Sequence, residues 1–230
     1  MLIFVHGMLS NADVWLPIID YFNERKFSCK AINLREGLNL KKVHFKDYVD
    51  KVKAIATEED IVIGHSMGGL IVQKVAEEAN IKCGVAICSA APKGLRYHRG
   101  IILSSSKFAP KVIMGRPFKQ DYGYVRKYAL AGLEEVKAKR IYEGMEKDSA
   151  IVVYELGMKR IKVDEKKVRC PLLFITTKQD GICTPDLVKR LAEKYNSEFK
   201  IFDGCHSFFY NSSWHDISEE IYIFIKKCTK

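Results

Sequence analysis

Residues 61–70 read Ile-Val-Ile-Gly-His-Ser-Met-Gly-Gly-Leu, and this stretch decides how the rest of the chain is interpreted. Residues 60–63 are typical of a short buried strand, because the run is largely apolar and β-branched. From Leu70 onward, apolar residues recur at helical spacing and polar residues take the opposite face. Ser66 therefore lies in a tight turn between a strand and a helix. Two kinds of turn fit that position: a glycine-rich anion cradle, or a turn that presents one hydroxyl group.

Short apolar segments and amphipathic helical segments alternate along much of the chain. The pattern predicts strands at 2–5, 29–34, 60–63, 83–89, 172–177 and 198–202, and helices at 14–23, 45–56, 67–79, 186–195 and 217–227. This alternation predicts an α/β protein with a doubly wound, mostly parallel sheet of about six strands and helices on both faces. In such a sheet, ligands bind at the carboxyl ends of the strands.

Residues 93–169 interrupt that alternation. The segment is helical in character, most clearly at 122–128 and 133–145, and it predicts no strand. It holds 19 Lys and Arg against 9 Asp and Glu, while the rest of the chain holds 19 of each, so the whole net charge of +10 lies in it. We therefore interpret residues 1–230 as a single domain with a helical lid inserted at 93–169.

The composition, 47% hydrophobic and 29% charged over 230 residues, is that of an ordinary globular protein. No apolar run approaches the roughly 18 to 20 residues of a membrane span, and the apolar start lacks a basic leader, so a cytoplasmic protein is expected. The seven cysteines are odd in number, irregularly spaced and without a C-x-x-C pair, which predicts neither a disulfide framework nor a metal site. No His, Asp and Glu cluster has ligand spacing either, so no metal is expected.

The turn at residues 64–69 fits one of its two interpretations. It lacks the lysine and the glycine spacing of phosphate-binding loops. It does match G-x-S-x-G, the nucleophile elbow, with a strand before it and a helix after it. Glycines two positions from the serine avoid collisions when the backbone there is strained. Ser66 is accordingly predicted to be a nucleophile rather than a simple helix N-cap.

A serine nucleophile needs a base and a carboxylate that orients the base. In a sheet of this kind the chain order is Ser, then Asp or Glu, then His. Asp180 follows the strand predicted at 172–177, and His206 follows the strand predicted at 198–202. The predicted catalytic residues are therefore Ser66, Asp180 and His206.

Two other carboxylates compete with Asp180 for the role of the acid. Asp186 follows Thr184-Pro185 and is typical of the first turn of a helix. Asp203 lies only three residues before His206, which is too local a separation to orient the ring. Asp180 is favoured over both.

Backbone N–H groups are expected to stabilise the oxyanion. One belongs to Met67, directly after the nucleophile. The other belongs to Met8 in the loop after the first strand, where Gly7 permits a close backbone approach. Gly7 and Trp15 are candidate substrate-binding residues, although Trp15 is equally suited to be a core residue of its helix.

These motifs together resemble the α/β-hydrolase superfamily, and within it the small single-domain esterases and lysophospholipases. The residues that carry the resemblance are His6-Gly7, the run 64–69, Asp180 with Thr184-Pro185, and His206. The resemblance covers about 1–92 and 170–230 and does not extend into 93–169. Members commonly have two strands before the His-Gly strand, which here begins at Leu2, so a fold that lacks those two strands is expected.

The resemblance implies a serine hydrolase that cleaves carboxylic esters through an acyl-enzyme on Ser66, without a cofactor. An acyltransferase, a carbon–carbon hydrolase and a perhydrolase use the same three residues and remain open. A non-catalytic small-molecule-binding protein of this fold is a further alternative. A pI near 9.2 is not accompanied by a recognition motif, so no nucleic-acid partner is expected. The oligomeric state is left open.

The expected partner is a small acyl ester, and the basic segment widens that expectation. Within residues 101–128, apolar side chains alternate with basic ones, which could form an apolar tunnel with a basic rim. Such a rim would suit a substrate with an anionic head group or a lipid surface, whereas the alternative is a merely solvated face. The basic residues in question are Lys107, Lys111, Arg116, Lys119, Arg126 and Lys127.

Overall fold

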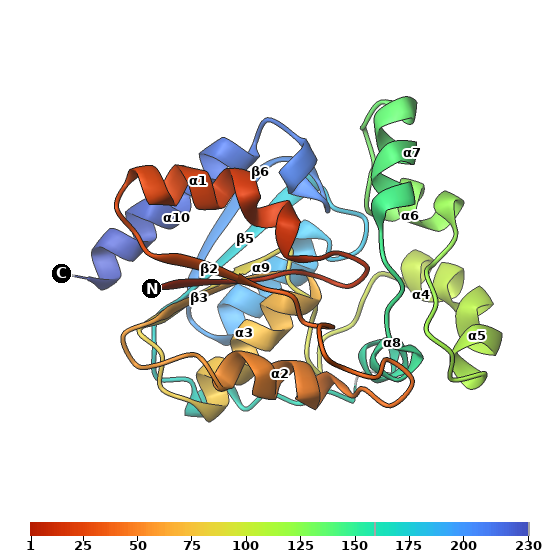
Figure 1. Ribbon diagram of the computed structural model, residues 1–230, viewed down its shortest axis with the longest axis horizontal. Helices are drawn as coiled ribbons and strands as arrows, with labels where there is room; N and C mark the ends of the chain where they lie inside the picture. Colours follow the sequence, from red (N-terminus) through yellow and green to blue (C-terminus); the bar gives the residue numbers. More distant parts are fainter. Residues whose placement is uncertain (159, 230) are drawn as a thin grey trace.

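The computed structural model describes residues 1–158 and 160–229, and its centre is a single sheet (Figure 1). The six strands lie in the order β2-β1-β3-β4-β5-β6, and every neighbouring pair is parallel. The predicted six-stranded parallel sheet is therefore confirmed. The strands are β1 (Leu2–Val5), β2 (Cys29–Ile32), β3 (Ile61–His65), β4 (Cys83–Ile87), β5 (Leu172–Gln179) and β6 (Glu198–Cys205).

Helices cover both faces of this sheet, as the alternation predicted. One face carries α1 (Leu16–Glu24) and α10 (Trp214–Cys228), and the other carries α2 (Phe45–Lys53), α3 (Met67–Glu78) and α9 (Pro185–Lys194) (Figure 1). Alternate residues of one strand serve the two faces. In β1, Ile3 and Val5 join the core under α2, α3 and α9, while Leu2 and Phe4 join the core under α1 and α10. Strands buried on both sides read as continuous apolar runs, which is why the sequence pattern located them.

Between β4 and β5 the described residues form a series of helices joined by loops. The helices are α4 (Arg99–Ser105), α5 (Ala109–Ile113), α6 (Tyr122–Tyr128), α7 (Glu135–Gly144) and α8 (Ala150–Gly157), with the short 3-10 turns η2 (Ser106–Phe108) and η3 (Glu165–Lys167). The other 3-10 turns are η1 (Ala12–Trp15) and η4 (Phe208–Tyr210). Figure 1 shows α4 to α7 beside one end of the sheet rather than on either face. Within residues 1–158 and 160–229, none of the helices combines the length and the apolar character that a membrane span requires.

The ends of three strands place the candidate catalytic residues. Ser66 directly follows β3, Asp180 directly follows β5, and His206 directly follows β6. Because the strands are parallel, their carboxyl ends meet at one edge of the sheet. Strands β5 and β6 run two and three residues further than the sequence pattern indicated, since polar residues at their ends masked the continuation.

Candidate active site

Three side chains from three strand ends form a hydrogen-bonded chain. His206 Nε2 lies 2.9 Å from Ser66 Oγ, and His206 Nδ1 lies 2.8 Å from Asp180 Oδ2. Because a carboxylate only accepts, Nδ1 carries the proton and Nε2 accepts from the hydroxyl of Ser66. Asp180 and His206 are buried, and Ser66 is partly exposed. A hydroxyl held in this way can pass its proton to the imidazole while its oxygen attacks an electrophile.

The carboxylate of Asp180 is fixed on both of its oxygens. While Oδ2 faces His206, Oδ1 accepts from the backbone N–H groups of Ile182 and Cys183, each at 2.8 Å. The two alternative acids lie on the surface. Asp186 pairs with Arg190 and Asp203 pairs with Lys178, and both carboxylates are more than three-quarters exposed. Of the three candidates, Asp180 is the one that the structure brings to His206.

The turn that holds Ser66 leaves no room for side chains beside it. Ser66 has φ 55° and ψ −116°, a conformation that costs a non-glycine residue free energy. A Cβ on Gly64 would lie 2.2 Å from the carbonyl oxygen of Gly68, and one on Gly68 would lie 2.3 Å from that of Val5. Backbone atoms cannot yield to such contacts as a flexible side chain can. The two glycines are therefore required by the packing of the turn against β1 and α3.

Replacing Gly68 by alanine is expected to lower the free energy of unfolding by about 3 kcal/mol or more, because overpacking against backbone forces the turn and β1 apart. Urea denaturation followed by circular dichroism measures the loss. Gly157→Ala is the matched control, since a Cβ there meets no atom within 4 Å and should cost nothing. A Gly68→Ala protein as stable as the control would contradict this account of the turn.

The backbone N–H groups of Met8 and Met67 are the candidates for binding an anionic oxygen beside Ser66. Met67 is the first residue of α3, and Met8 lies in the loop after β1. Neither N–H donates to a protein acceptor within the described part of the chain, so both remain available to a ligand. A Cβ on Gly7 would lie 2.9 Å from Ser66 Cβ, which shows how closely this loop approaches the nucleophile candidate. The arrangement can receive an anionic oxygen next to Ser66.

His6 braces the loop that carries Met8. Its Nδ1–H donates to the carbonyl of Gly7 at 2.7 Å, and its Nε2 accepts from the N–H of Leu34 at 3.1 Å. Burial lowers the pKa of His6 to about 4, so the ring is neutral near pH 7 and can accept from Leu34. Protonation would replace that acceptor with a second donor.

Stability is expected to fall on mild acidification. The unfolded chain binds a proton at His6 near pH 6.5 and the folded chain only near pH 4, so His6 lowers the unfolding free energy as pH falls between these values. The part of the loss from pH 7.5 to 5 that His6 accounts for is about 2 kcal/mol, measured by urea titration at each pH. Burial also lowers the pKa of His65, so His6→Gln should make the profile shallower by that amount without removing the slope, whereas the same change at exposed His98 should leave it unchanged. Equal slopes in the parent and in His6→Gln would refute the assignment.

A buried ion pair that the sequence did not indicate anchors the same loop. Asp148 is fully buried and accepts at Oδ2 from the N–H of Leu9 at 3.3 Å and from Arg35 at 3.1 Å, while its Oδ1 accepts from Tyr48 at 2.8 Å. Arg35 also donates to the carbonyl of Ser10. No local motif could have revealed this pair, because Arg35 and Asp148 are 113 positions apart.

The helical segment is also hydrogen-bonded to the loops that carry Asp180 and His206. The N–H of Gly181 donates to the carbonyl of Tyr128 at 3.2 Å, and the N–H of Ser207 donates to that of Ala129 at 3.1 Å. Gly181 follows Asp180, and Ser207 follows His206. The end of α6 is thus bonded to both loops.

A cavity of about 360 Å³ opens over Ser66 and His206. Its walls are mostly apolar and come from the loop after β1, from α6 and α7, and from the loop after β6; Met8, Tyr124 and Ile141 are examples. A cavity of this size is at the small end of the range for small-molecule sites.

Trp15 and the basic residues expected around the pocket lie elsewhere. Trp15 is fully buried in the core, with its ring 5.1 Å from that of Phe4 and 4.8 Å from that of Phe209, and it does not line the cavity. None of the six basic side chains expected to form a rim lines the cavity either. Several of them are engaged within the segment: Lys107 pairs with Asp121, Lys119 donates to the carbonyls of Tyr142 and Met145, and Arg126 pairs with Glu135.

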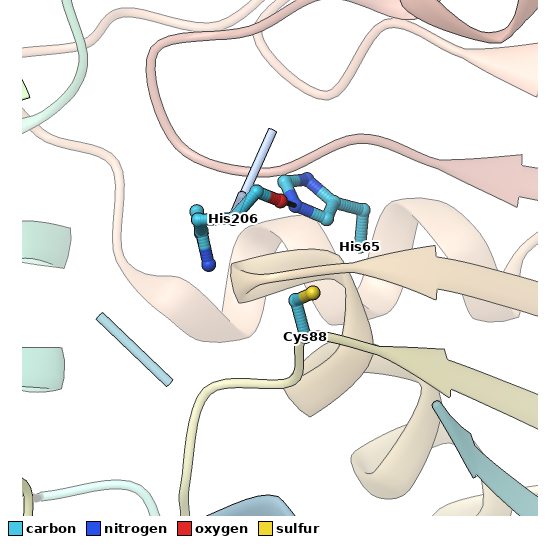
Figure 2. Close-up of side chains that lie close together, drawn as sticks. All are labelled: His65, Cys88 and His206. Atoms are coloured by element: carbon cyan, nitrogen blue, oxygen red, sulfur yellow. Dashed lines mark hydrogen bonds between the residues drawn. The ribbon is translucent and has the colours of Figure 1, made fainter. Parts of the chain in front are cut away.

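A second histidine lies against His206, and Figure 2 shows the two with Cys88. His65 donates from Nε2 to the backbone carbonyl of His206 at 2.8 Å. The candidate ligand atoms of His65, Cys88 and His206 lie within 4.8 Å of one another, a spacing that a metal could bridge. Both ring nitrogens of His206 are already hydrogen-bonded, however, and burial raises the pKa of the Cys88 thiol well above its usual value. The three residues are therefore poorly suited to hold a metal ion, and His65 instead supports His206 through its hydrogen bond.

Comparison with known proteins places this geometry in context. The family model described as "Serine aminopeptidase, S33" matches residues 1–221. No curated protein sequence matches the chain. Among solved structures, a methylesterase from Arabidopsis superposes with a TM-score of 0.74 at 14% identity, covering 98% of each chain. A lipase-esterase related protein from Clostridium acetobutylicum gives 0.73 at 23% identity, covering 97% of this chain and 93% of that one.

A third solved structure is tomato methylketone synthase I in complex with 2-tridecanone. Its TM-score is 0.71 at 16% identity, with 98% of this chain and 97% of that chain covered. The TM-scores show that these proteins share a fold with this chain, whereas identities below 25% do not show that they share a reaction.

Proposed function

The chain belongs to the serine aminopeptidase S33 family of α/β hydrolases, and from that premise we propose that it is a serine hydrolase that cleaves carboxylic esters of small molecules. The observation that carries the proposal is the hydrogen-bonded series Ser66–His206–Asp180, of which Ser66 and His206 line the cavity. Residues 93–169 act as the lid of the acyl pocket in this proposal, since α6 and α7 supply part of its wall.

The proposed reaction has two halves. Ser66 Oγ attacks the ester carbonyl while its proton passes to His206 Nε2, and the N–H groups of Met8 and Met67 donate to the oxyanion. The tetrahedral intermediate expels the alcohol, which takes the proton from His206, and an acyl-enzyme remains. Water attacks this ester with His206 as the base, and the acid leaves as Ser66 regains its proton. Asp180 holds the Nδ1–H tautomer and stabilises the transient imidazolium throughout.

An ester fits the cavity better than the peptide substrate of an aminopeptidase. A peptide's free amino terminus is an ammonium group, which requires a carboxylate when it is bound away from water. No Asp or Glu side chain lines the cavity within the described residues. Two of the similar structures are described as a methylesterase and a lipase-esterase related protein, which also favours an ester.

The test compares p-nitrophenyl esters of two to eight acyl carbons with aminoacyl p-nitroanilides. Ester turnover that declines for the longer chains is expected, because the cavity is small. Labelling by a fluorophosphonate, with the modified peptide identified by mass spectrometry, reports the nucleophile independently of the ester chosen. Cleavage of anilides alone would favour a peptidase, and neither labelling nor turnover would favour a non-catalytic binding protein. An acyltransferase would release acyl groups to an added alcohol faster than to water.

A further inference from the structure

A single arginine supplies the formal charge of the cavity wall. Apart from histidine and tyrosine, Arg140 is the one ionisable side chain that lines the cavity within the described residues. It makes no hydrogen bond and no ion pair with another described residue. The nearby Arg126 differs, because it donates to Glu135 and to two backbone carbonyls. Arg140 is therefore an exposed cation on the cavity wall that has no acidic partner among the described residues.

The position of Arg140 follows from the face that α7 turns to the cavity. Arg140, Ile141 and Gly144 all line it, and their spacing of one and four residues defines a single helical face. Lys137 and Lys139 do not line the cavity, and Lys137 donates to the carbonyl of Tyr210 instead. The register of the helix therefore determines that Arg140, and not Lys137 or Lys139, lies on the cavity wall.

A second polar side chain on the cavity wall also lacks partners. Gln120 is 94% buried, and its Oε1 accepts no hydrogen bond from the described residues. The backbone carbonyl of Gln120, by contrast, accepts from the hydroxyl of Tyr142 at 2.9 Å. A buried amide left unsatisfied costs about 1 to 3 kcal/mol, which a polar group of a ligand would recover. Gln120 and Arg140 both line this mostly apolar cavity, and each offers N–H groups to a ligand.

From these observations we infer that the substrate is a small ester whose acyl chain carries a carboxylate, a monoester of a dicarboxylic acid, and that Arg140 binds this carboxylate. The inference rests on the proposed ester hydrolysis. One cation matches one negative charge, and the planar guanidinium donates two parallel N–H groups to a carboxylate. The volume of about 360 Å³ limits the substrate to a short chain. Arg140 thereby sets specificity and takes no part in the bond-breaking steps.

The test compares monomethyl adipate with methyl hexanoate, two methyl esters with six acyl carbons of which only the first carries a charge. Acid release in a pH-stat gives kcat and KM. The parent is expected to favour the charged ester, and Arg140→Met to lower kcat/KM for it about tenfold, mainly through KM, with methyl hexanoate unchanged. Lys139→Met is the matched control, because it removes the same charge from the same helix outside the cavity. Circular dichroism confirms folding of each variant.

Each other outcome has a definite meaning. Equal effects of Arg140→Met on both esters, or an equal loss in Lys139→Met, would overturn the inference, since the first indicates a structural effect and the second long-range attraction. If neither ester is cleaved, the proposed hydrolysis fails, and the carboxylate site is tested by the binding of adipate instead. Adipate binding measured by calorimetry and weakened by Arg140→Met supports the carboxylate site, and adipate that does not bind the parent refutes it.

Discussion

Replacement of Ser66 by alanine is expected to lower kcat/KM for p-nitrophenyl esters by about 10⁴-fold or more, and to abolish fluorophosphonate labelling. The variant loses the atom that forms the acyl-enzyme, and His206 alone has no nucleophile to activate. The remaining N–H groups and the cavity would still bind the ester, so the loss is expected in kcat and not in KM. Initial rates at saturating ester, for parent and variant in parallel, measure it.

The fold of the Ser66→Ala protein is not expected to change. Alanine keeps the Cβ at φ 55°, so the strain of the turn stays as it was and the unfolding free energy should match that of the parent. Ser66→Gly should be equally inactive but more stable by about 1 kcal/mol, because glycine adopts this conformation without strain. Ser197→Ala, outside the cavity, serves as the control for rate. Full ester turnover by a folded Ser66→Ala protein would rule out this nucleophile.

Asp180→Asn is expected to lower kcat by about 10⁴-fold while leaving KM near its parent value. The amide nitrogen of asparagine can donate to Nδ1, which favours the imidazole tautomer with its proton on Nε2. That tautomer cannot accept the proton of Ser66. The measurement is kcat for p-nitrophenyl butyrate across pH 6 to 9, so that a shifted profile is not mistaken for a lost one.

Two surface aspartates provide matched controls for this change. Asp186→Asn and Asp203→Asn remove the same charge from carboxylates that pair with Arg190 and Lys178 in solvent. Exposed pairs contribute little, so activity should stay within about a factor of two of the parent. A loss in Asp203→Asn as large as that in Asp180→Asn would transfer the role of the acid to Asp203.

The parts of the fold that the sequence predicted are those encoded locally. Each strand of the sheet is a short apolar run, and the turn around Ser66 carries its steric requirement in Gly64 and Gly68. The order of the three candidate catalytic residues could be read because each follows a strand. Helices α4, α5 and α8 were not predicted, since they are short and lack a clear apolar period.

What the sequence could not supply depends on contacts between distant residues. Arg35 and Asp148 look like ordinary surface residues until the fold buries them together beside Leu9. Trp15 is suited equally to a pocket and to a core, and only the packing of Phe4 and Phe209 decides for the core. The same limit applies to charge, because the sequence shows how many cations the segment holds but not that, among those the structure describes, Arg140 is the one that lines the cavity.

Because the helical segment is hydrogen-bonded to the loops at the strand ends, the segment and the loops cannot be exchanged independently of each other. Carbonyls of Tyr128 and Ala129 accept from the loops that carry Asp180 and His206, and Asp148 accepts from Leu9 in the loop after β1. A graft that exchanged this segment for that of a relative would therefore remove hydrogen-bond partners from all three loops at once. New specificity is reached more safely by point changes at the residues of α7 that line the cavity than by transplanting the whole segment.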